Sequence, residues 1–516
     1  MILALLLIIP VAAGLIGWVL SRWNLAWTRW LALLAMVADF GICAALWFGA
    51  HGNIAFSGGG AWLASVRADW IPQLGVHFEL AMDGLSLVMV LLTAFLGAIS
   101  VVVSWATITR RVGFFHLNLM LVLAGVIGVF LALDLFLFYF FWELMLVPMY
   151  FLIDIWGHEK RHYAAIKFFI FTQASGLLML LAIIALYFVH GRATGEYTFD
   201  YTALIGTAMT PVTAKWLMLG FFIAFAVKIP AVPFHTWLPD AHTEAPTAGS
   251  VILAGLLLKT GAYGLIRFVV PLFPRAAFEF ADVGVILGVI GILYGAVLSF
   301  AQTDLKRLVA YTSISHLGFV LLGVFAWTPL SITGSVLQMV THALSTGALF
   351  IIAGAIQDRI GTRDMRRMGG FWAHAPRMGA VTLVFAMASL GLPGLGNFVA
   401  EFLILLGSYG THPVATIVAT AGLVTSTIYA LWMIQRAFYG PPREDVRPAD
   451  LRLHELAVAG VMIAALVWIG LYPKSLIART AGAVDSVRSI VSADAPESVQ
   501  QGEQGASPNS TAGEAP

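Results

Sequence analysis

Six side chains that can take up or release a proton occur within long apolar stretches of the chain. They are Glu143, Lys228, Lys259, His316, His342 and Glu401. A charge at mid-membrane costs about 2.5–3.5 kcal/mol even on a lenient scale, so these residues need a reason to be there. A buried lysine can lose its proton, whereas arginine keeps it at any accessible pH. Titratable groups on successive helices are the parts of a proton relay, in which Glu143 near Lys228 would hold that lysine protonated.

A structural role for the same residues stays open at this point. A buried Glu–Lys pair can simply join two helices, and a lone histidine in a helical bundle often only hydrogen-bonds a neighbour. His235 and His242 flank a proline-rich break, where gating and loop packing are equal alternatives. No phosphate-binding glycine loop with Lys-Ser/Thr occurs in the sequence, so we expect that ATP does not drive this chain directly.

The composition excludes an ordinary water-soluble enzyme. Of the 516 residues, 60% are apolar and 11% charged, and the mean hydropathy is +0.90. Soluble domains have about 45–50% apolar and about 25% charged residues. The net charge of +1 gives no electrostatic case for nucleic acid. The single cysteine, Cys43, excludes a disulfide framework and a cysteine-ligated cluster within this chain. We therefore expect a protein of the lipid bilayer.

The elements that must position the six residues are transmembrane helices. Apolar runs of about 20 residues cross the hydrocarbon layer, and we count fourteen of them. They lie near residues 2–20, 30–50, 82–105, 113–132, 135–156, 164–190, 212–234, 246–270, 279–300, 308–326, 331–356, 378–409, 413–435 and 454–472. Barrel strands are shorter and alternate in polarity. The sequence therefore predicts an all-α integral membrane protein.

The loops divide unequally in positive charge. One set holds 17 of the 28 Lys and Arg residues and the opposite set holds 7. Because cytoplasmic loops carry the excess of Lys and Arg, the distribution predicts both termini on the periplasmic side of a bacterial inner membrane. The polar, small-residue segment from about residue 492 is expected to be disordered.

Two of the predicted spans are interrupted by proline and glycine. The seventh reads FAVKIPAVPFHTWLPDAH from Phe225, and the twelfth reads FAMASLGLPGLGNFVAEF from Phe385. Shifted by 160 residues, the Phe-Ala pairs and the following prolines coincide. Matching breaks in two halves are typical of transporters built from repeats, and an odd shift of five spans makes the repeat inverted.

These patterns divide the chain into five parts. We expect three helices over 1–110, a first five-helix repeat over 111–272, and a second, inverted repeat over 273–436. The last span falls within 437–475 and the C-terminal tail within 476–516.

Several blocks of sequence resemble one known family. They are DGLSL at 83–87, GFFHLNLM at 113–120, FFWELMLVPMYFLI at 140–153, the long block at 220–260, FAQTDLKRLVAYTSISHLGFV at 300–320, TRDMRRMGG at 362–370 and GLPGLGNFVAEF at 391–402. Together they resemble the antiporter-like subunits of respiratory complex I, over about residues 1–475. Within that family the chain is most similar to the M type, because the sister L and N types carry a lysine where this chain has Glu401.

The resemblance implies fourteen helices with two inverted five-helix bundles, each with a half-channel around its broken helix. It implies that Glu143 and Lys228 act as the coupling pair and Lys259 as the central lysine. His316 and His342 would bridge to Glu401, the exit carboxylate. It also implies a proton-translocating role in NADH–quinone oxidoreductase, beside the neighbouring L and N subunits. NADH, FMN, the iron–sulfur clusters and quinone would be bound by partner subunits, with no cofactor in this chain.

Three other readings remain. The same bundle and lysines suit a subunit of a multi-subunit sodium/proton antiporter or of a membrane-bound hydrogenase. A third reading is a structural spacer whose buried charges only hold helices together. Sodium-dependent proton flux would favour the antiporter, and hydrogen as electron donor would favour the hydrogenase. Neutral substitutions that leave pumping intact would favour the spacer.

Overall fold

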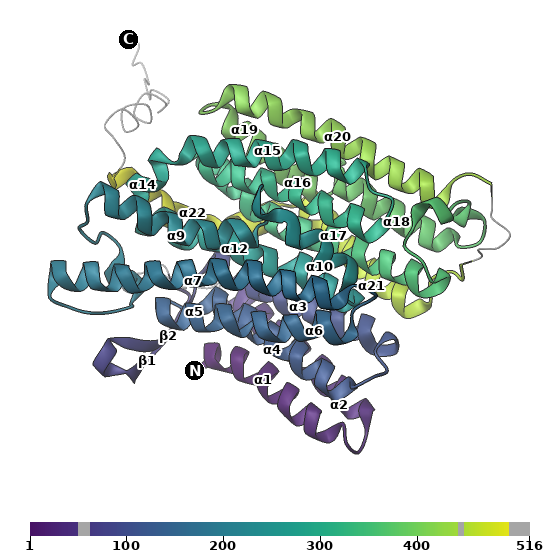
Figure 1. The fold of residues 1–516 in the computed structure, drawn as a ribbon, viewed down its shortest axis with the longest axis horizontal. Helices are drawn as coiled ribbons and strands as arrows, with labels where there is room; N and C mark the ends of the chain where they lie inside the picture. The colour runs from purple at the N-terminus through teal and green to yellow at the C-terminus, as the bar shows by residue number, and fades with distance from the viewer. Residues whose placement is uncertain (50–61, 442–447, 495–516) are drawn as a thin grey trace, which may run out of the picture.

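The computed structural model describes residues 1–49, 62–441 and 448–494, and these segments form a bundle of long helices (Figure 1). The long helices are continuous apolar runs, because a chain inside a bilayer must satisfy its backbone hydrogen bonds within each segment. The helices are α1 (Ile2–Leu20), α2 (Leu25–Gly49), α3 (Gly84–Thr107), α4 (Val112–Leu131), α5 (Leu135–Leu144), α6 (Leu146–Trp156), α7 (Arg161–Thr194), α8 (Tyr201–Leu204), α9 (Pro211–Lys228), α10 (Trp237–Glu244), α11 (Thr247–Ile252), α12 (Leu258–Gly264), α13 (Val270–Leu272), α14 (Pro274–Glu279), α15 (Ala281–Phe300), α16 (Leu305–Phe325), α17 (Pro329–Ile360), α18 (Pro376–Ser389), α19 (Gly396–Tyr409), α20 (Pro413–Phe438), α21 (Leu453–Leu471) and α22 (Lys474–Asp494).

The predicted all-α membrane fold is confirmed. Thirteen helical segments among the described residues are long and apolar enough to cross a membrane. Each coincides with one of the fourteen predicted spans. The remaining predicted span, 378–409, is divided between α18 and α19, and each of these is too short to count alone.

Both predicted helix breaks are present. In the seventh span, α9 ends at Lys228 and the chain resumes its α-helical path only at Trp237 of α10. In the twelfth span, α18 ends at Ser389 and α19 begins at Gly396. Gly391 and Gly394 between them have φ angles of 79° and 94°, a left-handed conformation that glycine adopts without steric cost. Proline and glycine therefore end these helices inside the bundle, where Lys228 becomes the last residue of α9.

The eighth span contains two irregular turns that the sequence did not predict. Residues Leu253–Leu257 and Leu265–Val269 are π-helical, and α12 lies between them. Every residue of the span's apolar window is buried. Such turns occur mostly as single insertions, frequently at functional sites. They bracket Lys259.

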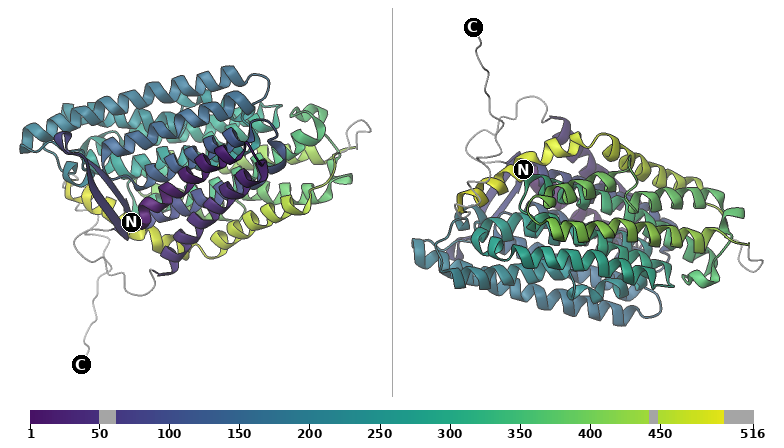
Figure 2. Two further views of the ribbon diagram at one scale, coloured as in Figure 1. Left: turned by 90° about the horizontal axis from the view of Figure 1, so that it is seen from below. Right: turned by 90° about the horizontal axis from the view of Figure 1, so that it is seen from above.

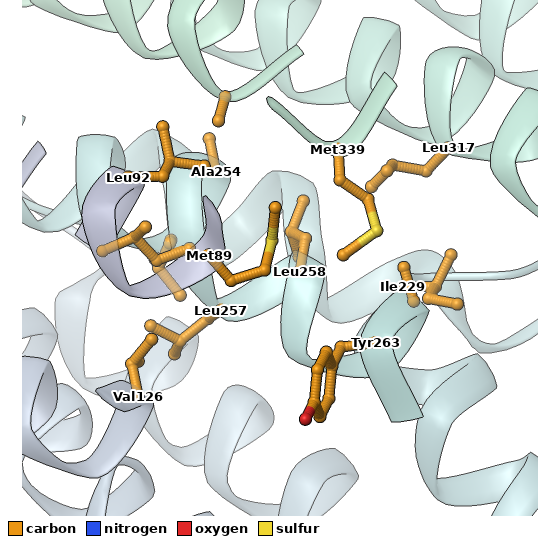
Figure 3. Close-up of a cluster of buried hydrophobic side chains, with 14 of the residues drawn as sticks. Met89, Leu92, Val126, Ile229, Ala254, Leu257, Leu258, Tyr263, Leu317 and Met339 are labelled. Atoms are coloured by element: carbon orange, nitrogen blue, oxygen red, sulfur yellow. The ribbon is translucent and has the colours of Figure 1, made fainter. Parts of the chain in front are cut away.

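The apolar core surrounds this eighth span. Figure 3 shows Leu257 and Leu258, the neighbours of Lys259, among side chains of other helices such as Met89, Leu317 and Met339. All of these side chains are at most 1% exposed. Lys259 therefore emerges from the most densely covered helix of the bundle.

A β-hairpin precedes α3. Strands β1 (Ala64–Ile71) and β2 (Val76–Met82) pair antiparallel, with Gly75 at the turn in a left-handed conformation, φ 64°. The sequence does not predict this hairpin, since strands of seven or eight residues contain no apolar run of about 20 residues.

The two ends of the described chain lie at the same end of the bundle. Figures 1 and 2 show α22 and the N-terminus toward the same end of the bundle, and the first residue of α3, Gly84, packs directly against the backbone of Arg479 in α22. The segment from 474 to 494, which the sequence placed mostly in a tail, is helical. The predicted disorder from about 492 falls largely on 495–516, outside the described residues.

Candidate functional site

Lys259 of α12 is fully buried and joins two helices of the bundle. Its Nζ donates to the carbonyl oxygen of Ala254 at 2.5 Å and lies 2.6 Å from Nδ1 of His342 in α17. Ala254 belongs to the π-helical turn immediately before Lys259. The irregular turn thus supplies an oxygen for the lysine as well as a local change in helix register.

His316 of α16 continues the cluster. The rings of His316 and His342 have centroids 5.6 Å apart. Nδ1 of His316 lies 2.9 Å from Oε1 of Glu401 in α19. Its Nε2 lies 3.1 Å from both the Ser389 and the Tyr429 hydroxyls. Both imidazole nitrogens of His316 are therefore engaged.

Glu401 receives a second hydrogen bond at the same oxygen. Gln338 of α17 donates from Nε2 to Oε1 of Glu401 at 2.9 Å. The other oxygen, Oε2, is buried and has no hydrogen-bond partner among the described residues. It lies beside Gly391 in the break between α18 and α19. One carboxylate oxygen thus faces His316, and the other faces the broken helix.

Lys228 and Glu143 lie in the first half of the bundle. Lys228 Nζ is 4.9 Å from the ring centroid of Trp142 and 5.8 Å from that of Phe168, a cation–π arrangement. Glu143 lies at the junction of α5 and α6, beside Gly176 of α7. Neither Lys228 Nζ nor Glu143 Oε1 has a hydrogen-bond partner among the described residues. The two groups share a region without forming a direct ion pair there.

The helices that carry Lys228 and Lys259 pack closely against each other at Gly261. A Cβ on Gly261 of α12 would lie 2.7 Å from the Phe225 carbonyl oxygen and 3.0 Å from Cβ of Lys228. Gly261, two residues after Lys259, therefore permits a close approach of α12 to the end of α9. The structure thus brings Lys259, His342, His316 and Glu401 together by contact. It places the end of α9, at Lys228, against α12, with no hydrogen bond or ion pair from Lys228 to the cluster among the described residues.

The two histidines at the seventh-span break differ. His242 of α10 is fully buried, stacks on Phe350 at 4.5 Å, and has no hydrogen-bond partner for either nitrogen among the described residues. His235 makes an edge contact with Tyr294 of α15. Both histidines are therefore buried, His242 against α17 and His235 against α15.

Three neutral partners of the cluster were not predicted, namely Tyr429, Ser389 and Gln338. Their hydroxyls and amide are uncharged, so nothing in the sequence distinguishes them from the other polar residues of apolar spans. Asp39 was missed for a different reason. It is a carboxylate in an apolar span, fully buried in α2 with both oxygens unpartnered among the described residues, so its position in the sequence meets the same criterion as the six predicted residues.

The comparisons with known proteins agree on one family. The family model described as "NADH:quinone oxidoreductase/Mrp antiporter, TM" matches residues 132–428. NADH-quinone oxidoreductase subunit M of Pseudomonas aeruginosa is 53% identical over 95% of this chain and 97% of its own length. The corresponding protein of Escherichia coli K12 is 50% identical over 95% and 98%.

The chain belongs to the subunit M family of NADH-quinone oxidoreductases.

A solved structure supports the same assignment. A chain of respiratory complex I from Thermus thermophilus with bound NADH matches 95% of this chain and all of its own length, with a TM-score of 0.84 and 30% identity. The predicted resemblance to the complex I subunits, and to the M type among them, is confirmed. This member of the subunit M family is a multi-pass, proton-translocating membrane subunit of an NADH–quinone oxidoreductase.

Proposed function

We propose that protons cross this subunit along a route that begins at Lys228 with Glu143, passes through Lys259, His342 and His316, and ends at Glu401. The observation that carries the proposal is the contact series from Lys259 to Glu401. It consists of a 2.6 Å lysine–histidine contact, two neighbouring imidazoles and a 2.9 Å histidine–carboxylate contact.

The chemistry of each group suits a step of that route. A buried lysine gives up its proton readily because the surroundings disfavour the ammonium. Imidazole accepts a proton at one nitrogen and releases one from the other. Glu401 then holds the proton beside the broken twelfth span, where its second oxygen is free of partners within the described chain.

The step from Lys228 to Lys259 has no direct contact. Burying a polar group without a hydrogen bond is costly, so the unpartnered Lys228 Nζ and Glu143 Oε1 are places where internal water would bind. We infer that water completes this step. Glu143 then influences the protonation of Lys228 through its charge alone, because the two side chains form no ion pair within the described chain.

We also propose the surroundings of the subunit by analogy with this family. Neighbouring antiporter-like subunits L and N flank this chain in the membrane arm, and NADH, FMN, iron–sulfur clusters and quinone bind to partner subunits. The charge of the loops orients both termini to the periplasm of a bacterial inner membrane. Protons then enter on the cytoplasmic side and leave at Glu401 toward the periplasm, with the two halves acting as inverted repeats.

Lys228→Met tests the route in the assembled complex. We expect NADH-linked proton pumping into closed vesicles to fall by about two orders of magnitude, the contribution of a positioned proton-transfer group, while the complex still assembles. The matched control is Lys215→Met, which removes an exposed lysine from the same helix, α9. Full pumping by an assembled Lys228→Met complex would refute the route. Sodium-dependent flux without NADH would instead favour an antiporter.

A further inference from the structure

A basic cavity of about 360 Å³ lies outside the proton route, at the end of the bundle where α3, α4, α6 and α7 meet. Three arginines line it, Arg110, Arg111 and Arg161. It also contains one carboxylate, Asp154, which already contacts His162 at 2.5 Å. The lining therefore carries a net positive charge.

The arginines are available to a ligand. Within the described part of the chain, Arg110 and Arg111 form no ion pair and are exposed. One guanidinium nitrogen of Arg161 donates a long hydrogen bond of 3.4 Å to the Gly157 carbonyl oxygen. The Nε of Arg161 is buried without a partner among the described residues. Guanidinium groups with free donors bind phosphate oxygens in paired hydrogen bonds.

The N-termini of two long helices, α4 and α7, lie at this cavity. α4 begins after Arg111 and α7 after Lys160, and neither has a side-chain cap or an acidic residue in its first turn. The N-terminus of a helix carries a partial positive charge and free N–H groups. Together with the arginines, it makes the cavity a site for an anion.

Exposed tryptophans indicate the depth at which the cavity lies in the bilayer. Trp23, Trp27 and Trp30 are between 50% and 74% exposed at the same end of the bundle, and tryptophan concentrates at the level of lipid headgroups. Arg29, beside Trp30, donates to the carbonyl oxygen of Ile108 in the cavity lining at 3.2 Å. The cavity thus lies at headgroup depth.

We propose that this cavity binds the phosphate of an anionic phospholipid, held by Arg110, Arg111 and Arg161 at the ends of α4 and α7. The assignment of that lipid to the cytoplasmic leaflet rests on the proposed orientation of the chain. Basic cavities between membrane helices on the cytoplasmic side have the chemistry for such headgroups.

The test uses the purified whole complex and a photoactivatable phosphatidylglycerol. Peptide mapping should find the label in segments 106–112 and 154–162. Arg110→Gln with Arg111→Gln should raise the half-saturating lipid concentration about thirtyfold, from about 1 kcal/mol for each arginine near the membrane surface. The lysine versions of both residues should keep most of the binding, since the charge remains.

The matched control is Arg377→Gln. Arg377 is also an exposed arginine in the first turn of a helix, α18, at the same end of the bundle, but it does not line the cavity. Equal labelling by the phosphatidylcholine analogue, or labelling unchanged in the glutamine variant, overturns the proposal. Inorganic phosphate that prevents all labelling would also overturn it. The same holds if the glutamine variant loses a neighbouring subunit while labelling persists. A Lys228→Met complex should bind the lipid normally, which separates this proposal from the proton route.

Discussion

Lys259 and His342 are 83 positions apart in the sequence, and their side-chain nitrogens are 2.6 Å apart. The contact joins the eighth span to α17, two of the most completely buried segments of the bundle. A lysine and a histidine this close cannot both carry a full charge at low cost, because like charges repel strongly away from water. The pair therefore holds one proton more easily than two, which is the condition for passing it on.

His342→Gln should reduce NADH-linked pumping by about two orders of magnitude. Glutamine can still hydrogen-bond Lys259, but its amide cannot accept and release a proton near neutral pH. The measurement is proton uptake by vesicles containing the complex. His454→Gln, which removes an exposed histidine of α21, is the control. Normal pumping by an assembled His342→Gln complex would exclude His342 from the route.

Glu401→Gln should stop pumping to a similar degree, since the amide keeps the shape of the side chain and loses the acid. The hydrogen bond from Gln338 can be retained by the new amide oxygen, so assembly should survive. Glu196→Gln provides the comparison at an exposed glutamate. If the Glu401→Gln complex pumps as fast as this control, the exit assignment is wrong.

Tyr429→Phe tests a positioning residue. Its hydroxyl lies 3.1 Å from Nε2 of His316, and one such hydrogen bond is worth about 1 kcal/mol, so pumping should fall about fivefold. Because the hydroxyl orients the imidazole and biases its protonation, the pH profile of pumping should also shift. A changed rate with an unchanged profile would assign Tyr429 to packing alone. Tyr439→Phe, at an exposed tyrosine, should change neither.

His158, in the turn between α6 and α7, predicts a pH dependence of stability. Burial, together with the nearby positive charges of Lys306 and Arg363, lowers the pKa of His158 to about 4. The unfolded chain, with a pKa near 6.5, takes up a proton as pH falls through this window while the folded protein does not. Stability is therefore lost between about pH 6.5 and about 4.

The size of this effect is about 1–2 kcal/mol after allowance for solvent screening. His158→Gln should remove it, so that the thermal midpoint of the complex falls less between pH 7 and pH 5 than in the parent protein. Exposed His162→Gln is the control. Parallel pH curves for the His158→Gln variant and the parent would contradict the assignment.

The sequence was sufficient for the membrane-spanning helices and for the buried charged side chains of the Lys259–Glu401 cluster. Hydrocarbon imposes long apolar runs, and it makes each buried charge conspicuous, so Lys259, His316 and Glu401 were identifiable one by one. Their pairing was not, since the Lys259–His342 and His316–Glu401 contacts join residues more than eighty positions apart.

Other features of the structure have no recognisable pattern in the sequence. The π-helical turns around Lys259 depend on packing between helices, and no residue type specifies them. Tyr429 and Gln338 are neutral, and many neutral side chains occur in membrane helices. Whether Glu143 and Lys228 touch depends on side-chain directions, which spacing along the chain does not determine.

The contact between Lys259 and His342 also limits how the proposed route can be used. An ammonium has hydrogens and no lone pair, so while Lys259 is charged, Nδ1 of His342 must present its lone pair and Nε2 carries the hydrogen. When the proton moves onto Nδ1 and the hydrogen at Nε2 departs, the ring is left as the opposite tautomer. Its Nδ1 then has no lone pair to offer a recharged lysine. On the proposed route, the imidazole therefore passes one proton and cannot pass a second until the ring rotates or a proton returns through it.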